Sequence, residues 1–483
     1  MPNSSQILSR TPALSRLEER VRFDLETIAH PRLEWLTPRI GPDGKPALDV
    51  LIIGAGQSGV ATAFGLRRRR VTNVLAVDRA QRGLEGPWWT YARMHTLRSP
   101  KDYNGPDLDI ASLAYPNWHI ARYGAKDWEA LGLIPTTAWG EYLLWVRDVI
   151  GLPVENQTEV VAIHPAVDGL FPVTLVGPGN RSRTIHTRKI VLATGQDGMG
   201  LWWMPPELDL LPVWLRAHAA HPIDFEGLNG KIVAVLGAGA SAFDNAATAL
   251  EHGAREVIIF CRRNRPQVIQ PYRWLTFRGF LDHLGDLEDA WRWRFMRHIL
   301  ALREGFPQET WDRCAAHPNF RLVTAAPWSD VREDRGQVLI VTPKGQFRAD
   351  FVIAGTGVEM DFGVRPELAT FAHNIATWAD KYTPPEDERD ERLQRFPYLS
   401  ANYSLTEKML GETPWIEHIH LFTIASTMSF GPSGSSINAM TTVVPKLVSA
   451  ISRGLFRDDV KDHWASLQAY ETPQAIIPES RLE

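Results

Sequence analysis

The stretch DVLIIGAGQSG, residues 49–59, decides the fold of this chain. An apolar run ends in three glycines, Gly54, Gly56 and Gly59, and a segment compatible with a helix, residues 60–70, follows. This order of strand, tight turn and helix is typical of a dinucleotide-binding βαβ unit. Gly54 permits the turn, Gly56 lets a pyrophosphate approach the backbone, and Gly59 lets the helix pack on the strand. The free N–H groups at the helix start would face two phosphates.

An acidic residue stands where a ribose would lie. The second apolar run, residues 74–77, ends at Asp78, which lies 22 positions beyond Gly56. A carboxylate at the end of a second strand accepts hydrogen bonds from the ribose hydroxyls. The site is therefore expected to include Asp78 together with Gln57, Ser58 and Arg79. The alternative is a glycine-rich turn that holds no ligand.

A second fingerprint follows later in the chain. The buried-strand run KIVAVL, residues 231–236, leads into Gly237, Gly239, Ser241 and Ala242, which give the pattern G-x-G-x-x-A. The next strand ends at Arg262 and Arg263, where an NAD site usually has an acid. Arginines suit a 2′-phosphate, so the pattern favours NADPH over NADH. Solvated loop charges are the alternative for the two arginines.

Two such fingerprints predict an α/β fold with two Rossmann-like domains, the second inserted into the first. We expect four regions: an N-terminal helical extension over 1–47, the first part of the first dinucleotide-binding domain over 48–220, an NADPH-binding domain over 221–349 with a helical insert at 270–318, and the second part of the first domain with a C-terminal helix over 350–483. The last boundary rests on Gly355-Thr356-Gly357, which echoes Ala193-Thr194-Gly195 and suggests a return to the first domain.

Composition excludes several classes of protein. The net charge of −4 favours neither nucleic-acid binding nor attraction to an anionic membrane, and no apolar run approaches the roughly 20 residues that span a bilayer. The polar N-terminus lacks the order of a signal peptide, so a cytoplasmic protein is expected. The two cysteines, 53 residues apart, argue against a zinc site and a dithiol relay.

Three further segments are candidates for contact with a cofactor. Gly86-Pro87-Trp88 combines a turn with a bulky aromatic residue. The strand-like run 159–163 contains Val161, and a later apolar strand closes on Ala193, Thr194 and Gly195. Each brings backbone or an aromatic face close to a possible ligand. Each is also compatible with an ordinary turn or core position.

The order of these motifs resembles the class B flavoprotein monooxygenases, which include flavin-containing, Baeyer–Villiger and N-hydroxylating enzymes. The resemblance covers roughly residues 48–262 and 350–453. It implies FAD at the first fingerprint, with Asp78 on the ribose and Gly86-Pro87-Trp88 beside the flavin. It also implies NADPH on the second fingerprint, with Arg262 and Arg263 at the 2′-phosphate.

The resemblance also suggests where catalytic groups lie. The segment RSPKD, residues 98–102, corresponds to the family segment near flavin C4a, and Arg98 stands where flavin-containing monooxygenases carry an asparagine. Arg98 and Lys101 are therefore candidates for stabilising charge there, and His95 is a further candidate. The family pattern F-x-G-x-x-x-H is met only at His218, because Pro212 and Trp214 occupy its first two defined positions.

The activity implied is NADPH-dependent insertion of one oxygen atom of O₂ into a small organic substrate through a C4a-(hydro)peroxyflavin. The oxygenated centre would be a nitrogen, a sulfur or a ketone carbon. One alternative is a flavin reductase or oxidase that releases hydrogen peroxide, and another is a non-catalytic redox-sensing flavoprotein. The expected partners are the substrate and O₂, with a homodimer possible. No pattern in the chain identifies the substrate.

Overall fold

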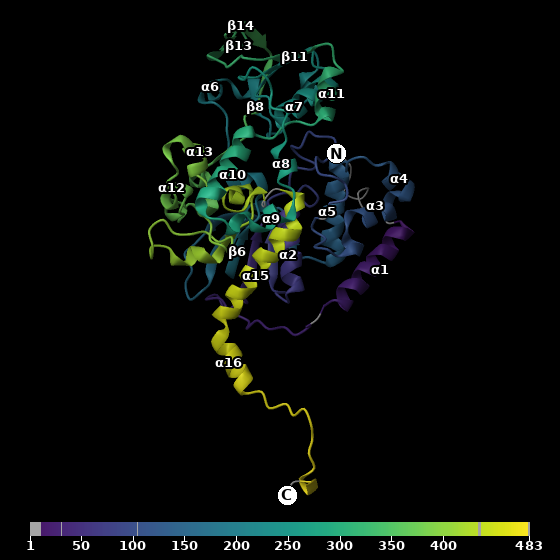
Figure 1. Ribbon diagram of the computed structural model, residues 1–483, viewed down its shortest axis with the longest axis vertical. Coiled ribbons are helices and arrows are strands. Elements are labelled where there is room, and N and C mark those ends of the chain that lie inside the picture. Colours follow the sequence, from purple (N-terminus) through teal and green to yellow (C-terminus); the bar gives the residue numbers. More distant parts are fainter. Residues whose placement is uncertain (1–10, 30, 104, 433–435, 482–483) are drawn as a thin grey trace.

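The computed structural model of the chain describes residues 11–29, 31–103, 105–432 and 436–481. Two sheets of mainly parallel strands, each with helices packed against it, form the two halves of the molecule (Figure 1). The larger sheet lies in the lower half of the view and the smaller sheet at the top. No helix in the described residues is long and apolar enough to cross a membrane.

The larger sheet has seven strands in the order β3-β2-β1-β6-β5-β4, with β17 beside β6. Strands β3, β2, β1, β6 and β17 are parallel, and β5 and β4 continue from β6 as an antiparallel meander. Strand β6 is long enough to join both parts. Its bounds and those of its neighbours are β1 Leu48–Ile53, β2 Val74–Val77, β3 Val154–Glu155, β4 Glu159–Ile163, β5 Phe171–Gly177, β6 Arg181–Leu192 and β17 Ile419–Leu421.

Helix α2, Gln57–Arg68, follows β1 through the glycine turn. It is buried from Ser58 to Leu66, because α15, Met440–Asp458, covers its outer side. A Cβ added at Gly65 would lie 2.9 Å from the Val448 side chain, so the small residue sets the approach of the two helices. Helix α15 therefore packs directly on the helix that begins at the glycine turn.

The smaller sheet has five parallel strands in the order β11-β10-β9-β15-β8. Helix α7, Ala240–Glu251, follows β9 and packs on the sheet. A three-stranded antiparallel sheet lies beside it. The strands are β8 Arg216–His218, β9 Ile232–Leu236, β10 Glu256–Phe260, β11 Phe320–Val323, β12 Asp330–Asp334, β13 Gln337–Thr342, β14 Gly345–Ala349 and β15 Phe351–Ala354.

These pairings correct the expected domain boundaries. Strand β15 pairs with β9, so the chain has not returned to the first domain at residue 350. Strand β8 precedes residue 221 and also belongs to the smaller sheet. The crossing between the domains is a two-stranded ribbon in which β7, Gly200–Trp202, pairs with β16, Val358–Met360. The second domain therefore lies between these two strands, as an insertion into the first.

In both sheets, the first glycine of the fingerprint packs against the end of a neighbouring strand. This repetition explains why the predicted domain boundary at residue 350 is wrong. A Cβ on Gly54 would lie 2.5 Å from the carbonyl oxygen of Ala193, which follows β6. A Cβ on Gly237 would lie 2.5 Å from the carbonyl oxygen of Gly355, which follows β15. Each fingerprint thus closes on the end of its own neighbouring strand. The echo between residues 193–195 and 355–357 marks equivalent places in two domains.

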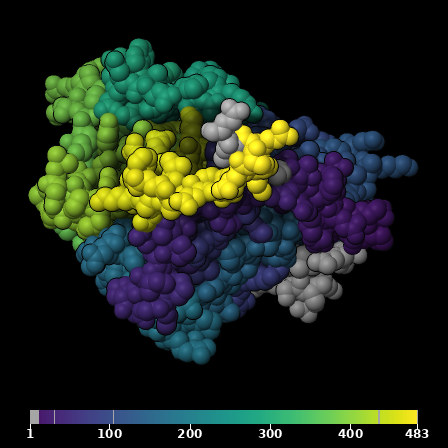
Figure 2. Space-filling model, turned by 90° about the horizontal axis from the view of Figure 1, so that it is seen from below, coloured from purple at the N-terminus to yellow at the C-terminus, as the bar shows by residue number. Residues whose placement is uncertain are grey.

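The insert at 270–318 is helical, as expected, and lies between the two halves. Below the larger sheet in Figure 1, α16 and the described residues after it extend away from the body. Figure 2 shows the molecule from this lower end. The remaining α-helices are α1 Pro12–Thr27, α3 Tyr115–Tyr123, α4 Ala125–Ala130, α5 Thr136–Ile150, α6 Pro206–Asp209, α8 Pro271–Trp274, α9 Arg278–His283, α10 Asp289–Leu302, α11 Gln308–Ala315, α12 Trp378–Lys381, α13 Glu391–Gln394, α14 Thr427–Phe430 and α16 Val460–Gln468.

Candidate active site

A cavity of about 1870 Å³ opens at the carboxyl ends of β1, β2 and β6. Its wall continues along residues 86–103, then along the segment after β8, the helical insert and the residues before α15. Ligands of open parallel sheets bind at the carboxyl ends of strands, where loops diverge. The cavity is therefore the place where a bound dinucleotide and a substrate can meet.

The glycine turn has the geometry that a bound pyrophosphate needs. Gly54 has a φ of 101°, which favours glycine. A Cβ on Gly59 would lie 1.9 Å from the carbonyl oxygen of Gly54, so only glycine lets α2 start so close to the turn. A Cβ on Gly56 would have no described atom nearer than 3.9 Å. The backbone at Gly56 therefore faces open space, and the turn fits FAD.

Asp78 holds this turn from the end of the second strand. Its Oδ2 accepts a hydrogen bond from the backbone N–H of Ala55 at 2.8 Å, and its Oδ1 accepts one from Ala80 at 2.8 Å. Asp78 lines the cavity, and the adjacent Arg79 forms an ion pair with Asp197. One carboxylate thus orders the turn and faces the expected ribose position.

The first-domain residues proposed to bind cofactor mostly gather on this wall. The wall includes Gly54, Gly56, Gln57, Ser58, Asp78, Arg79, Gly86, Pro87, Trp88, Ala193, Thr194 and Gly195. Gly59 lies behind the turn, where it packs the helix. Val161 is outside the wall because the strand register shifts between Val160 and Ala162, which leaves Val160 on the cavity side.

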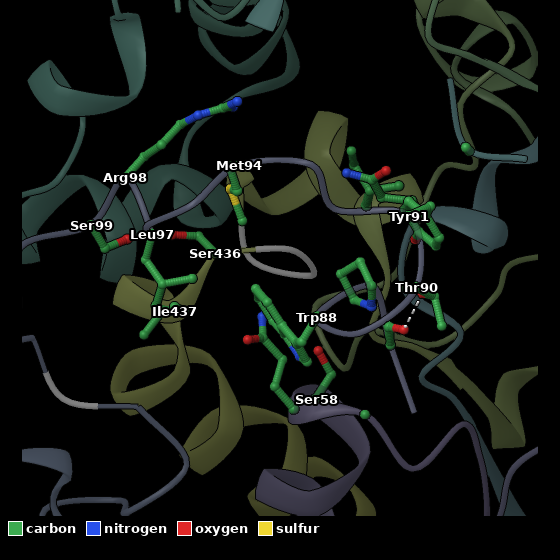
Figure 3. Close-up of a pocket in the computed structure, with 18 of the residues that line it drawn as sticks. Ser58, Trp88, Thr90, Tyr91, Met94, Leu97, Arg98, Ser99, Ser436 and Ile437 are labelled. Atoms are coloured by element: carbon green, nitrogen blue, oxygen red, sulfur yellow. Dashed lines mark hydrogen bonds between the residues drawn. The ribbon is translucent and has the colours of Figure 1, made fainter. Parts of the chain in front are cut away.

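The aromatic segment beside the turn forms one side of the cavity. Trp88 stands next to Ser58 in Figure 3, with Leu97 and Ile437 on neighbouring parts of the wall. The Nε1 of Trp88 is buried and has no hydrogen-bond partner in the described part of the chain. Trp88 packs edge-on against Trp139, with 6.4 Å between ring centroids. An indole N–H in such a place suits a bound acceptor.

The three candidates for catalytic charge are all engaged by protein groups. The guanidinium of Arg98 points away from Trp88 in Figure 3 and pairs with Asp244 at 2.8 Å and Glu304 at 2.9 Å. The ammonium of Lys101 donates to the backbone oxygens of Trp128 and Leu131 at 2.7 and 2.6 Å.

His95 lies outside the described cavity wall, and its side chain is 57% exposed. Its Nε2 is 3.5 Å from Glu251. Arg98 and Lys101 both line the cavity. The chain therefore brings two of these three residues to the cavity, and the charged ends of both are bonded to protein groups.

His218, the histidine that matches the family pattern, ends β8 beside the crossing between the domains. Its Nε2 lies 3.0 Å from the carbonyl oxygen of Gly357, and its Nδ1 accepts from the backbone N–H of Ala220 at 3.1 Å. Burial, with a smaller contribution from His221, lowers the pKa of His218 to about 4. The ring is therefore neutral and structural at neutral pH, while His221 lines the cavity.

The second glycine turn lies outside the cavity wall and faces outward. Gly239 caps α7, and a Cβ there would meet no described atom within 4 Å. Ser241 is exposed, and Ala242 is buried against Gly355. Arg262 and Arg263 follow β10 and are both exposed. The turn therefore has the open approach that a second dinucleotide needs, and the residues fit NADPH.

The sequence alone predicts no individual residue of the far wall of the cavity. Gln270 and Tyr272 come from the insert, and Asn438 comes from the turn before α15. The Nδ2 of Asn438 donates to Thr276 at 3.4 Å, while its Oδ1 is buried and unpaired within the described residues. No motif marks these positions, because the polar residues come from two distant segments of ordinary composition.

Neither cysteine has a role at this site. Cys261 and Cys314 are buried and free, and burial raises the pKa of Cys314 to about 12. The described residues contain no group of three or more side chains arranged to hold a metal ion.

Comparison with known proteins identifies relatives of the whole chain. A family model described as FAD-NAD(P)-binding matches residues 51–197. The FAD-dependent urate hydroxylase of Xanthomonas campestris pv. campestris is 37% identical over 460 residues, which covers 95% of this chain and 96% of the relative.

Solved structures of similar fold include two amino-acid hydroxylases. The ornithine N-hydroxylase of Kutzneria sp. 744 is 16% identical, with a TM-score of 0.64, and covers 85% of this chain and 100% of its own. The L-lysine 6-monooxygenase of Pseudomonas syringae is 17% identical, with a TM-score of 0.63, and covers 84% of this chain and 99% of its own. At these identities the similarity establishes the shared fold.

Proposed function

This chain belongs to the class B FAD-dependent flavoprotein monooxygenases, and we propose that its substrate is urate or a closely related oxopurine anion. The single observation that carries the proposal is the similarity to the Xanthomonas urate hydroxylase along nearly the full length of both chains. The family uses FAD, NADPH and O₂. What we propose in addition for this chain is that its substrate is an oxopurine.

We assign FAD to the larger sheet and NADPH to the smaller one. FAD, once reduced by NADPH, supplies the chemistry that activates O₂ for transfer of one oxygen atom. The turn around Gly56 would hold the pyrophosphate of FAD, and Asp78 would hold its ribose. Gly239 would admit the pyrophosphate of NADPH, with Arg262 and Arg263 near the 2′-phosphate.

The far wall of the cavity supports a planar substrate rich in carbonyl and N–H groups. Asn438 offers a buried oxygen that has no hydrogen-bond partner among the described residues, while Gln270 and Tyr272 add polar groups nearby. Arg273 also lines the cavity and is exposed. Urate is an anion with both donors and acceptors around its edge, so this wall can match its hydrogen-bonding pattern. A buried polar group discriminates strongly against substrates that leave it unpaired.

The protein's part is to hold the reactants and exclude water. Trp88, Leu97 and Ile437 give the cavity an apolar side, against which a flat ring can pack. We keep Arg98 and Lys101 as proposed residues near the reacting atoms. Their charged ends, however, already bind protein partners. We expect them to shape the wall more than to act on the substrate.

The test is NADPH oxidation by the yellow protein in air, with hydrogen peroxide measured in parallel. With urate we expect faster oxidation, disappearance of urate and little peroxide. Xanthine, ornithine and lysine serve as comparison compounds. Peroxide equal to NADPH consumed, with no effect of urate, would contradict the proposed substrate and favour an oxidase.

A further inference from the structure

The short segment Arg93–Arg98, here called the strap, joins the two domains at the cavity wall. Its backbone is bonded to the first domain: Leu97 donates to the carbonyl of Ile134, and Thr136 donates to the carbonyl of His95. The side chain of Thr136 also donates to the carbonyl of Met94. The strap is therefore fixed on one side to the start of α5.

The other side of the strap is bonded to the second domain and its insert. Arg98 pairs with Asp244 of α7 at 2.8 Å and with Glu304 at 2.9 Å. Thr96 donates to Glu309 at 2.8 Å, and the Arg93 carbonyl accepts from Arg313 at 3.1 Å. The strap is therefore bonded to both domains.

Asp244 is the centre of these contacts. It is 4% exposed and receives a hydrogen bond from Thr310 at 2.9 Å in addition to its pairs with Arg98 and Arg313. A buried carboxylate needs such partners, because removing it from water is costly. Asp244 lies outside the cavity wall and reaches the cavity only through Arg98.

The helix that carries Asp244 also begins at Gly239, the turn that we assign to NADPH. The strap in turn carries residues that line the cavity beside the flavin position, including Met94 and Leu97. NADPH is assigned to the start of α7, and FAD is assigned beside the strap. We therefore expect the contacts between α7 and the strap to hold the two cofactors at a fixed distance from each other. Hydride transfer depends steeply on such placement.

We propose that Asp244 is a positioning residue which, through Arg98, holds the flavin wall in register with the NADPH-binding helix. The inference concerns the assigned FAD and NADPH sites and does not depend on urate being the substrate. In the step it governs, NADPH gives a hydride to FAD, and with one proton the products are NADP⁺ and reduced FAD. Loosening the strap would slow this transfer without removing any group from the cavity.

The experiment compares Asp244→Asn with Asp49→Asn in the full-length, FAD-loaded protein. Asp49 is a matched control, since it is 5% exposed, pairs with Arg188 at 3.2 Å and lies outside the cavity wall. Two readouts are used: the anaerobic rate of FAD reduction at saturating NADPH, and hydrogen exchange of the amides in residues 93–101. Neither requires an oxygenation substrate.

In Asp244→Asn we expect reduction to be slower by about 10-fold to 100-fold, with faster exchange in the strap. Asp49→Asn should leave both unchanged even if its melting temperature falls equally. An unchanged reduction rate in Asp244→Asn overturns the proposal, whether or not exchange rises. If that variant retains no FAD, hydrogen exchange of residues 93–101 in the natural and Asp244→Asn apoproteins decides, and equal exchange in the two overturns the proposal.

Discussion

At the residue scale, two of the three glycines of the first fingerprint, Gly56 and Gly59, separate ligand binding from folding. A Cβ at Gly59 would overlap the carbonyl oxygen of Gly54 at 1.9 Å, whereas a Cβ at Gly56 would meet nothing closer than 3.9 Å. One glycine is needed by the protein itself and the other by the ligand. The same motif therefore makes two different predictions.

We expect Gly56→Ala to fold normally and to bind FAD about 10-fold more weakly, equal to about 1.4 kcal/mol. The added methyl would stand where the pyrophosphate approaches the backbone. Gly59→Ala should instead lower the free energy of unfolding by about 3 kcal/mol, as overpacking does. FAD titration and thermal unfolding of the two apoproteins measure this contrast. Equal melting temperatures for the two variants would contradict it.

His218 gives a prediction about pH. Its pKa in the fold is about 4, below the ordinary value near 6.5, because burial disfavours the charged ring. Between those values the unfolded chain binds a proton that the folded chain does not, so stability rises with pH. The contribution is complete above about pH 6.5 and is lost as the pH falls towards 4. The ceiling is about 3 kcal/mol.

His218→Gln keeps a donor that can reach the carbonyl of Gly357 and removes the titration. Its melting temperature should therefore fall less than that of the natural protein between pH 7 and pH 4.5. His420, whose pKa is also lowered to about 4, remains in both proteins and accounts for part of the fall that persists. Identical pH profiles would show that His218 does not set the acid sensitivity.

At the element scale, sequence periodicity predicts both strand–turn–helix units, because their cause is local. The runs before Gly54 and Gly237 are apolar, and the glycines that follow are required by the turns themselves. The prediction that β15 belongs to the first domain was wrong, because strand pairing depends on contacts between segments that are distant in the sequence. The motif Gly355-Thr356-Gly357 looks the same in either domain, and only the sheet order shows that it closes on Gly237.

The candidate site also has a part that the sequence predicts and a part that it does not. The near wall of the cavity could be predicted, because glycine, acid and strand end have a fixed spacing in a βαβ unit. The far wall, with Gln270, Tyr272 and Asn438, could not, since the insert and the residues before α15 meet only in the folded chain. Arg98 is a candidate because the segment RSPKD resembles the family segment near flavin C4a, but its partners Asp244 and Glu304 lie far along the sequence.

At the element scale, the loop after β10 leads to a prediction about the choice between NADPH and NADH. Arg262 and Arg263 are exposed beside the second glycine turn, where a 2′-phosphate would lie. Replacing both by glutamine should raise the KM for NADPH by at least about 10-fold, since a hydrogen bond to a charged group contributes roughly 1.5 to 3 kcal/mol. The KM for NADH should change little. Steady-state rates with both cofactors decide, and an equal effect on both would contradict the assignment.

At the scale of the whole molecule, the two domains share one cavity but differ in how they contribute to it. The first domain supplies the glycine turn and the aromatic side, while the second supplies the helix that we propose for NADPH and the contacts of the strap. The ribbon of β7 and β16 is the covalent crossing between them, and His218 supports it through Gly357. Function in this arrangement depends on the relative placement of two bodies that each fold around their own sheet.

The C-terminal segment takes no part in this arrangement. The nine residues of α16 include no buried side chain in the structure as described, and residues 470–481 are exposed as well. Figure 1 shows the segment extending from the body, and none of its described residues lines the cavity. Removing residues 469–483 should therefore change the free energy of unfolding by no more than about 0.5 kcal/mol, as for other surface changes.

The measurement is thermal unfolding and size-exclusion chromatography of the truncated and full-length proteins. Equal melting temperatures, FAD content and elution volumes are expected, because no described contact of the core is lost. A lower melting temperature together with a smaller particle would contradict this. It would mean that Tyr470, Ile476 and Ile477, which are 68%, 90% and 63% exposed in the single chain, are covered by a second copy.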